Sequence, residues 1–295
     1  MAVNDIGLYR LSNGTQVQID RNDTLTAHTW ITVASLHATT GTTGTVFLAA
    51  ALNPDDLDTN LTTQHTNLSW DSKQACVVMQ QELRIGKLII SSKPIHDAAP
   101  EQIINIVCEA VKKEGISLLN WSDEVQRLQR RVATVAAWHP EMQVPNLSTP
   151  HLLDTASQWF PLYLTQGNRI AQNAIELKKI DLKEVLWNII PYDIQLTIDR
   201  IAPTHIQVPT GSRIRIDYRA GASAPVLSVR LQECFGMKQT PCVDDGRQPL
   251  LIELLSPGFK PVQLTQDLHS FWQNTYFEVR KELRRRYPKH YWPDD

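Results

Sequence analysis

The C-terminal fold is decided by Leu264-Thr-Gln-Asp-Leu-His-Ser-Phe-Trp-Gln-Asn-Thr-Tyr-Phe-Glu-Val-Arg-Lys-Glu-Leu-Arg-Arg-Arg-Tyr-Pro-Lys-His-Tyr-Trp-Pro293. Apolar side chains recur along it at the spacing of one helix face. They are Leu268, Phe271, Trp272, Tyr276, Val279 and Leu283. Pro288 cannot continue a helix, so the helix should end just after Arg286. We expect one amphipathic helix whose apolar face packs on a core.

The other side of this helix and the tail behind it are basic and aromatic. Cations interleaved with rings suit contacts with phosphates and bases. The candidate nucleic-acid-binding residues are Arg213, Arg215, Arg280, Lys281, Arg284, Arg285, Arg286, Lys289, His290 and Trp292. Two plainer interpretations stay open. The charged run also suits a solvated face that complements the helix dipole, and the tail aromatics also suit packing back onto the domain to hold the terminus.

Charge changes along the chain. With 295 residues, 42% hydrophobic and 20% charged, the composition is that of an ordinary globular protein. The net charge is only −2, but residues 1–66 hold two Arg against six Asp, whereas residues 205–295 hold thirteen Lys or Arg against ten Asp or Glu. An anion-binding surface is therefore expected toward the C-terminus.

Several kinds of site and segment lack their sequence signals. The four cysteines, Cys76, Cys108, Cys234 and Cys242, form no CxxC pair, so neither a zinc site nor a redox motif is indicated. The N-terminal residues Met1–Arg10 show no positive segment followed by an apolar run, so we expect that they are not a signal peptide. No apolar run approaches the roughly 20 residues that a membrane span needs. We expect a cytoplasmic protein without membrane insertion.

Three regions follow from the periodicity, and the fold class is α+β. Residues 1–96 alternate as short strands, with Asn13-Gly14 as a hairpin turn, and suggest an OB-like β-barrel domain; a small β-sandwich fits the pattern nearly as well. Residues 97–203 have the helical period and form a helical subdomain. Residues 204–295 form a small β-sheet with the closing helix packed on it.

The third region should contain two hairpins and one further helix. The hairpins are 205–218, which turns at Pro209-Thr-Gly211-Ser212, and 250–264, which turns at Ser256-Pro-Gly258. Between them, the apolar run Val226–Phe235 is ambiguous. We predict a helix there, because Gly236 follows as a typical cap.

No catalytic constellation is recognisable. Gly86-Lys87 lacks the earlier glycine and the Ser or Thr of a phosphate-binding loop, and no Gly-x-Ser-x-Gly is present. The nine histidines include no pair at i, i+4 spacing. An independent hydrolase would need a clustered acid, base and nucleophile, which the sequence does not offer. We predict no catalytic residue and no metal ligand.

Four stretches resemble the C-terminal part of the bacterial HrpB-type DEAH-box ATP-dependent helicases. They are Ala202–Tyr218, Pro225–Glu233, Leu254–Pro257 with Pro261–Leu268, and Phe271-Trp272 through Tyr287-Pro-Lys-His290 to Trp292-Pro293. The likeness continues more loosely through Leu118-Leu-Asn-Trp-Ser-Asp123 and Tyr9-Arg-Leu-Ser-Asn-Gly14. Cys234 and Cys242 stand where the family pattern would have other residues, which affects no expected role.

The resemblance implies that the RecA-like motor domains lie outside this chain, together with the ATP and Mg site, so that this chain itself holds no cofactor. It further implies a non-catalytic accessory platform. Its partners would be RNA or single-stranded nucleic acid, its own helicase motor domains and a protein partner. The alternative is a protein-protein interaction scaffold without direct RNA contact.

Overall fold

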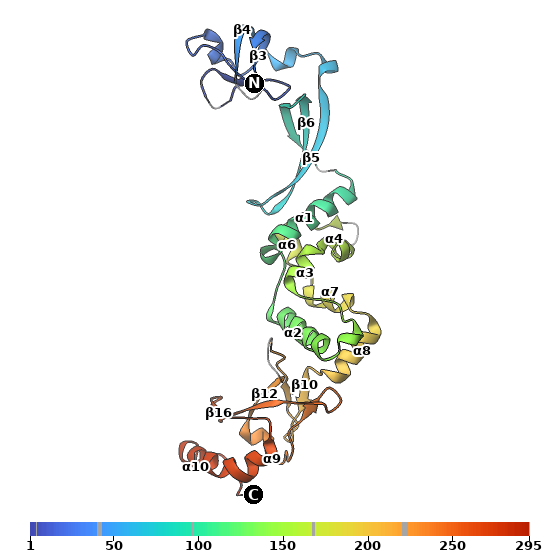
Figure 1. Cartoon of the computed structure of the whole chain (residues 1–295), viewed down its shortest axis with the longest axis vertical. Helices are drawn as coiled ribbons and strands as arrows, with labels where there is room; N and C mark the ends of the chain where they lie inside the picture. The colour runs from blue at the N-terminus through green and yellow to red at the C-terminus, as the bar shows by residue number, and fades with distance from the viewer. Residues whose placement is uncertain (4, 40–42, 96, 167–168, 220–223, 295) are drawn as a thin grey trace. The chain divides into compact units, whose positions relative to one another are not determined.

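The computed structural model describes residues 1–3, 5–39, 43–95, 97–166, 169–219 and 224–294 (Figure 1). The chain forms two compact units: residues 1–110 with 166–174, and residues 111–165 with 175–295. Several small sheets and a set of short helices make up the fold, so the predicted α+β class is confirmed. Among the described residues, no helix is long and apolar enough to span a membrane.

The first unit begins with a four-stranded sheet in the order β1-β2-β4-β3. The strands are β1 (Leu8–Arg10), β2 (Gln16–Gln18), β3 (Ile31–His37) and β4 (Gly44–Ala51). β1 and β2 pair across the turn at Asn13-Gly14, as predicted. Tyr9 and Val17 are buried at the centre, and the Tyr9 hydroxyl donates to the carbonyl oxygens of Leu25 and His28, both at 2.7 Å. These bonds satisfy the buried hydroxyl and fix the loop over the sheet.

A second sheet follows in the order β5-β6-β7. Its strands are β5 (Thr63–Asp71), β6 (Cys76–Ile85) and β7 (Leu88–Pro94). The seven strands described within residues 1–96 thus lie in two open sheets, and the closed OB-like barrel that we predicted is not seen there. Closure requires each strand to turn an apolar face inward. Residues 63–67 of β5 are exposed throughout, so that end of the strand covers no interior.

Helices dominate the middle of the chain. They are α1 (Pro100–Leu118), α2 (Asp123–Trp138), α3 (Thr149–Asp154), α4 (Ala156–Trp159), α5 (Pro161–Leu164), α6 (Ala174–Leu177), α7 (Leu182–Ile189) and α8 (Tyr192–Ile201). Ser122 caps α2 by accepting from the Val125 amide, and Asp181 caps α7 by accepting from the Glu184 amide. Leu128, Val132 and Val135 lie at helical spacing on α2 and are buried.

The C-terminal part carries three small sheets. Its strands are β10 (His205–Gln207), β11 (Arg213–Arg215), β12 (Val226–Arg230), β13 (Cys242–Val243), β14 (Gln248–Pro249), β15 (Leu251–Leu255) and β16 (Pro261–Thr265). Both predicted hairpins are present, as β10-β11 and β15-β16. The helix predicted over Val226–Phe235 is wrong. Residues 226–230 form β12, which pairs in parallel with β15, and a parallel strand buried on both faces has the same continuous apolar run as a buried helix.

The closing helix is present and contains one irregular turn. It runs through α9 (Leu268–Ser270), a π-helical turn (Phe271–Thr275) and α10 (Tyr276–Arg286), and it ends just before Pro288 as predicted. Phe271, Tyr276 and Leu283 are buried. Trp292 is buried too: its indole N–H donates to the Tyr287 carbonyl at 3.0 Å, and its ring lies 6.4 Å from that of Phe235. The tail therefore packs back onto the domain.

One glycine holds the two sheets of the first unit together. Gly86, at the turn between β6 and β7, has φ of +53°, and a Cβ there would overlap the Ser12 carbonyl oxygen. The next amide, that of Lys87, donates to the same oxygen at 2.7 Å. The close approach of the two hairpins thus requires glycine at this position.

We expect Gly86→Ala to lower the free energy of unfolding of the first unit by about 1–3 kcal/mol, because the added methyl group meets rigid backbone at a positive φ. The matched control is Gly14→Ala, also at positive φ (+91°), whose Cβ would meet only the flexible Lys87 side chain, at 2.9 Å. Urea denaturation of the two variants measures the difference. Equal losses of stability would show that the contact with Ser12 is unimportant.

Candidate nucleic-acid interface and basic pocket

The exposed face of α10 gathers four of the predicted cations around one aromatic ring. Arg280, Lys281, Arg284 and Arg285 line a shallow groove of about 280 Å³ together with Phe277. Phe277, Lys281 and Arg284 follow one another at i, i+4 and i+7, so their side chains share one face. The Phe277 side chain is 62% exposed. Sequence reasoning missed this ring as a site residue, although its helical spacing from the cations could have revealed it.

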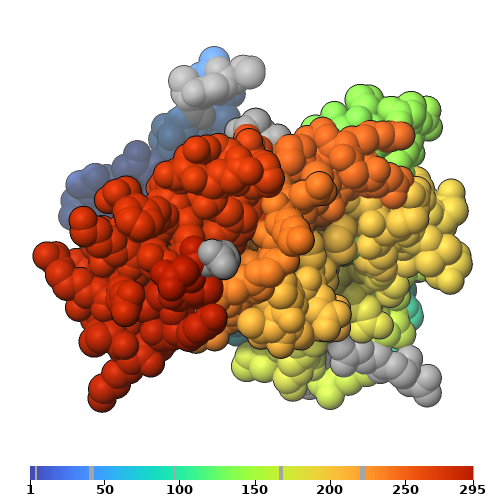
Figure 2. Space-filling view, turned by 90° about the horizontal axis from the view of Figure 1, so that it is seen from below, coloured from blue at the N-terminus to red at the C-terminus, as the bar shows by residue number. Residues whose placement is uncertain are grey.

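Few carboxylates compensate the positive charge on this face of α10. In the described part of the chain, no carboxylate forms an ion pair with Lys281, Arg284 or Arg285. Arg280 instead donates to the Pro293 carbonyl at 3.0 Å and pairs with Asp294, and its guanidinium lies 5.6 Å from the centre of the Phe277 ring. Figure 2 shows the C-terminal segment, in red, at the surface on the left of the view.

The other predicted residues near the C-terminus have different environments. Arg286 lies 4.0 Å from Glu282, outside the groove. Lys289 and His290 are exposed, and the His290 ring packs edge-on against Tyr287 at 6.0 Å. Trp292 is buried, as described above. Its present packing therefore holds the terminus and does not offer the ring to a ligand.

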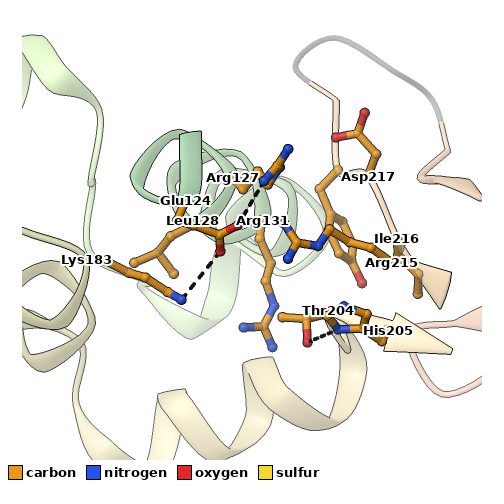
Figure 3. Close-up of a pocket in the computed structure, with 11 residues that line it drawn as sticks. Glu124, Arg127, Leu128, Arg131, Lys183, Thr204, His205, Arg215, Ile216 and Asp217 are labelled. Atoms are coloured by element: carbon orange, nitrogen blue, oxygen red, sulfur yellow. Dashed lines mark hydrogen bonds and ion pairs between the residues drawn. The ribbon is translucent and has the colours of Figure 1, made fainter. Parts of the chain in front are cut away.

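Arg213 and Arg215 lie on β11, and no cavity found in the described residues contains either of them together with the α10 cations. Arg213 is exposed. Arg215 enters a pocket of about 200 Å³ between the helices and the β10-β11 hairpin of the second unit (Figure 3). The ten predicted residues thus do not form one site, and the helical region supplies pocket residues that sequence reasoning missed: Glu124, Arg127, Arg131 and Lys183.

Glu124 is the centre of this pocket. Its carboxylate accepts from Arg215 Nη1 at 2.6 Å and from Arg127 Nη1 at 2.8 Å, and Lys183 Nζ lies 3.5 Å away. Figure 3 shows these three cations reaching it from different elements. The Arg215 hydrogen bond is the main cause that lowers the pKa of Glu124 to about 2. Burial, and then the charges of Arg215 and Arg213, lower the pKa of His205 in the same pocket. The pKa shift of Glu124 thus reflects nearby positive charge, whereas burial contributes most to the pKa shift of His205.

Arg131 forms the floor of the pocket. It is 7% exposed, and its Nε donates to the Ala202 carbonyl at 2.6 Å. Nη2 pairs with Asp199 at 2.6 Å, and the guanidinium lies 5.6 Å from the centre of the Trp187 ring. These contacts join α2 to α7 and α8. Arg131 therefore positions the chain that leads from α8 into the β10-β11 hairpin.

A histidine–aspartate pair lies elsewhere in the same unit. His139 Nε2 is 2.7 Å from the Asp244 carboxylate, which is buried, and Nδ1 is 2.9 Å from Glu141. The two carboxylates raise the pKa of His139, with Asp244 as the main cause. Because both ring nitrogens face acceptors, neither is left to take a proton from a nucleophile. We therefore interpret this pair as a structural contact between two distant segments of the chain and not as the general base of a hydrolase.

Comparisons with known proteins define the class. A family model described as "ATP-dependent helicase C-terminal" matches residues 159–295. Residues 159–295, just under half of the chain, are therefore similar to the C-terminal part of ATP-dependent helicases. The predicted resemblance to the HrpB type is confirmed: the "ATP-dependent RNA helicase HrpB" of Escherichia coli (strain K12) is 34% identical over 293 residues. That match covers 98% of this chain and 36% of the relative, so the chain spans about a third of its length.

Two solved structures are similar to the chain over nearly its whole length. The crystal structure of the E. coli DExH-box NTPase HrpB matches with a TM-score of 0.65 and 34% identity, over 99% of this chain and 36% of that one. The crystal structure of the Escherichia coli DEAH/RHA helicase HrpB matches with a TM-score of 0.59 and 31% identity, over 98% and 36%.

The contact between His139 and Asp244 predicts a pH dependence of stability. The folded-state pKa of His139 is raised, so its stabilising contribution is fully present below the unfolded-state pKa of about 6.5 and is lost as the pH rises through the folded-state value. We expect the free energy of unfolding of the second unit to fall by roughly 1 kcal/mol across this rise. His139→Gln should remove that slope in urea titrations at several pH values. An unchanged slope in the variant would assign the effect to other groups.

Proposed function

We propose that this chain is a non-catalytic accessory part of an ATP-dependent RNA helicase and that it contacts single-stranded RNA through the basic face of α10. One observation carries the proposal: the exposed Phe277 ring lies among Arg280, Lys281, Arg284 and Arg285. Single-stranded nucleic acid is bound by stacking of bases on aromatic rings beside cations that contact the phosphates. This groove offers both kinds of contact on one helix face.

The distribution of charge supports a role for α10 rather than for the first unit. Residues 1–66 are acidic, with six Asp against two Arg, so strong electrostatic attraction of RNA is not expected there. If the first unit also contacts RNA, it does so by shape, backbone amides or stacking. The α10 face, by contrast, presents Lys281, Arg284 and Arg285 without partner carboxylates in the described residues.

ATP and Mg are proposed to act outside this chain. The sequence has no phosphate-binding loop of the Gly-x₄-Gly-Lys-Ser/Thr type. In this proposal the helicase motor domains bind the nucleotide, and the chain assists them by holding RNA in the cytoplasm of a bacterium. The reading frame of the gene upstream of Met1 tests this part: a Walker-type loop and a DEAH-type box would support it.

A protein-interaction scaffold is the second candidate. It is favoured by the exposed apolar side chains of β4, where Phe47 is 70% and Leu48 is 61% exposed. Exposed apolar residues that lie side by side are common at protein interfaces. The separation of Arg213 and Arg215 from the α10 cations also favours it, because it leaves a smaller cationic area for RNA.

The RNA proposal predicts salt-dependent binding that relies on α10. Arg284→Ala with Arg285→Ala should weaken binding of a single-stranded oligonucleotide roughly tenfold near 0.1 M salt. The salt slope should fall by about 1.4, because two phosphate contacts are lost and each contributes about 0.7 on a single strand. Phe277→Ala should cost about 1–3 kcal/mol of binding free energy with little change in salt slope, because it removes stacking and not charge. Fluorescence anisotropy over a range of salt concentrations measures both.

The matched control is Lys178→Ala with Lys179→Ala, which removes two exposed cations that follow α6. This control should bind RNA like the unmodified chain. If the α10 variant also binds normally, the proposed interface is wrong. If the isolated chain ignores RNA even at low salt and loses a defined protein partner when Phe47 and Leu48 are made polar, the scaffold function is the correct one.

A further inference from the structure

The Glu124 pocket has a surplus of positive charge that the proposed function does not use. It is lined by four permanent cations and two carboxylates. Two of these six groups are neutralised by residues outside the lining: Arg131 pairs with Asp199, and Asp217 pairs with Arg219 at 2.9 Å. Glu124 is thus the single remaining carboxylate among Arg127, Lys183 and Arg215, which leaves a net charge of about +2 to be compensated from outside.

The three cations are arranged to hold a small anion. In the described contacts, both Arg127 and Arg215 approach Glu124 through Nη1, and a guanidinium can donate to an anion through two N–H groups side by side. Lys183, at 3.5 Å, is the loosest of the three partners. The cavity beside them measures about 200 Å³ and is open to solvent on the side of these half-exposed side chains.

We propose that this pocket binds a phosphate group, which is held by Arg127, Lys183 and Arg215, and that Glu124 occupies the centre of the cation cluster when the ligand is absent. A phosphate dianion carries the two negative charges that the cluster lacks and more acceptor oxygens than a carboxylate. Because Arg127 and Lys183 belong to α2 and α7 whereas Arg215 belongs to β11, the ligand would strengthen the attachment of the hairpin to the helices.

This site is independent of the α10 groove, since the two cavities share no residue. The test uses the whole chain and inorganic phosphate. We expect millimolar phosphate to raise the melting temperature by about 2 °C or more relative to chloride at the same ionic strength, because a ligand of the folded state stabilises it. Arg127→Ala with Lys183→Ala should abolish this shift, and isothermal titration calorimetry should show no binding heat for that variant.

Glu124→Gln distinguishes a binding site from a structural ion-pair cluster. Without phosphate, this variant should melt lower than the unmodified chain, because three cations lose their counter-charge. With phosphate, its shift should exceed that of the unmodified chain, because the competing carboxylate is gone. A purely structural cluster would give the lower melting temperature without phosphate but not the larger shift with phosphate. Lys183→Ala alone is the milder variant: Lys183 is half-exposed and contacts only Glu124 in the described residues, so the fold should survive while the shift falls by half or more.

Lys178→Ala with Lys179→Ala serves as the control, since it removes two exposed cations that lie outside both the pocket and the α10 groove and should keep the full phosphate shift. Equal shifts in all variants would overturn the proposal, because phosphate also stabilises proteins in general by exclusion from their surface. The absence of any shift in the unmodified chain would overturn it too. A 5′-phosphorylated and a 5′-hydroxyl oligonucleotide identify the source: stabilisation by the first alone indicates a terminal phosphate, and by both indicates backbone phosphates.

Discussion

The second unit depends on the buried guanidinium of Arg131. A charge this deep in the protein is costly unless every side of it is paired, and here the pairing comes from the end of another helix. The Ala202 carbonyl, at the C-cap of α8, accepts from it, as does the Ile198 carbonyl, which also accepts from the Ala202 amide, and Asp199 balances its charge. The direction in which the chain leaves α8 is thereby fixed. Tyr218 closes the arrangement by donating to the Pro203 carbonyl at 2.8 Å.

Elements stabilised by their own sequence were the ones that could be predicted. The turn at Asn13-Gly14 and the stop at Pro288 both act over a few residues, and each is present. Strand β12 could not be assigned in this way, because its partner in the sheet, β15, lies about 25 residues further along the chain. The helical appearance of the run before Gly236 is a local signal that this pairing overrides. Closure of the N-terminal strands into a barrel is likewise a long-range property, which short alternating runs do not encode.

The candidate site also combines features that the local sequence indicates with features that depend on residues far away in the chain. Clustered cations on one helix are visible in the sequence, and Arg284 and Arg285 do share one face with Lys281. Arg215, however, acquires its environment from Glu124, 91 residues away, which no local pattern indicates. Nor could the sequence decide between a free and a packed tail. That choice depends on Phe235, which covers Trp292 and lies far from it in the chain.

The packed tail also bears on the interpretation of α10. Cations in the last turn of a helix complement its dipole, so a solvated face accounts for Arg284, Arg285 and Arg286 without any ligand. It does not account for an exposed phenylalanine beside them. Arg280 lies against this ring and is itself held by Pro293 and Asp294. The tail therefore orders Arg280, and Arg280 in turn restrains the Phe277 ring within the cations. An aromatic surface ordered in this way loses less entropy when a base stacks on it, which is why we assign the groove to RNA and the tail to its support.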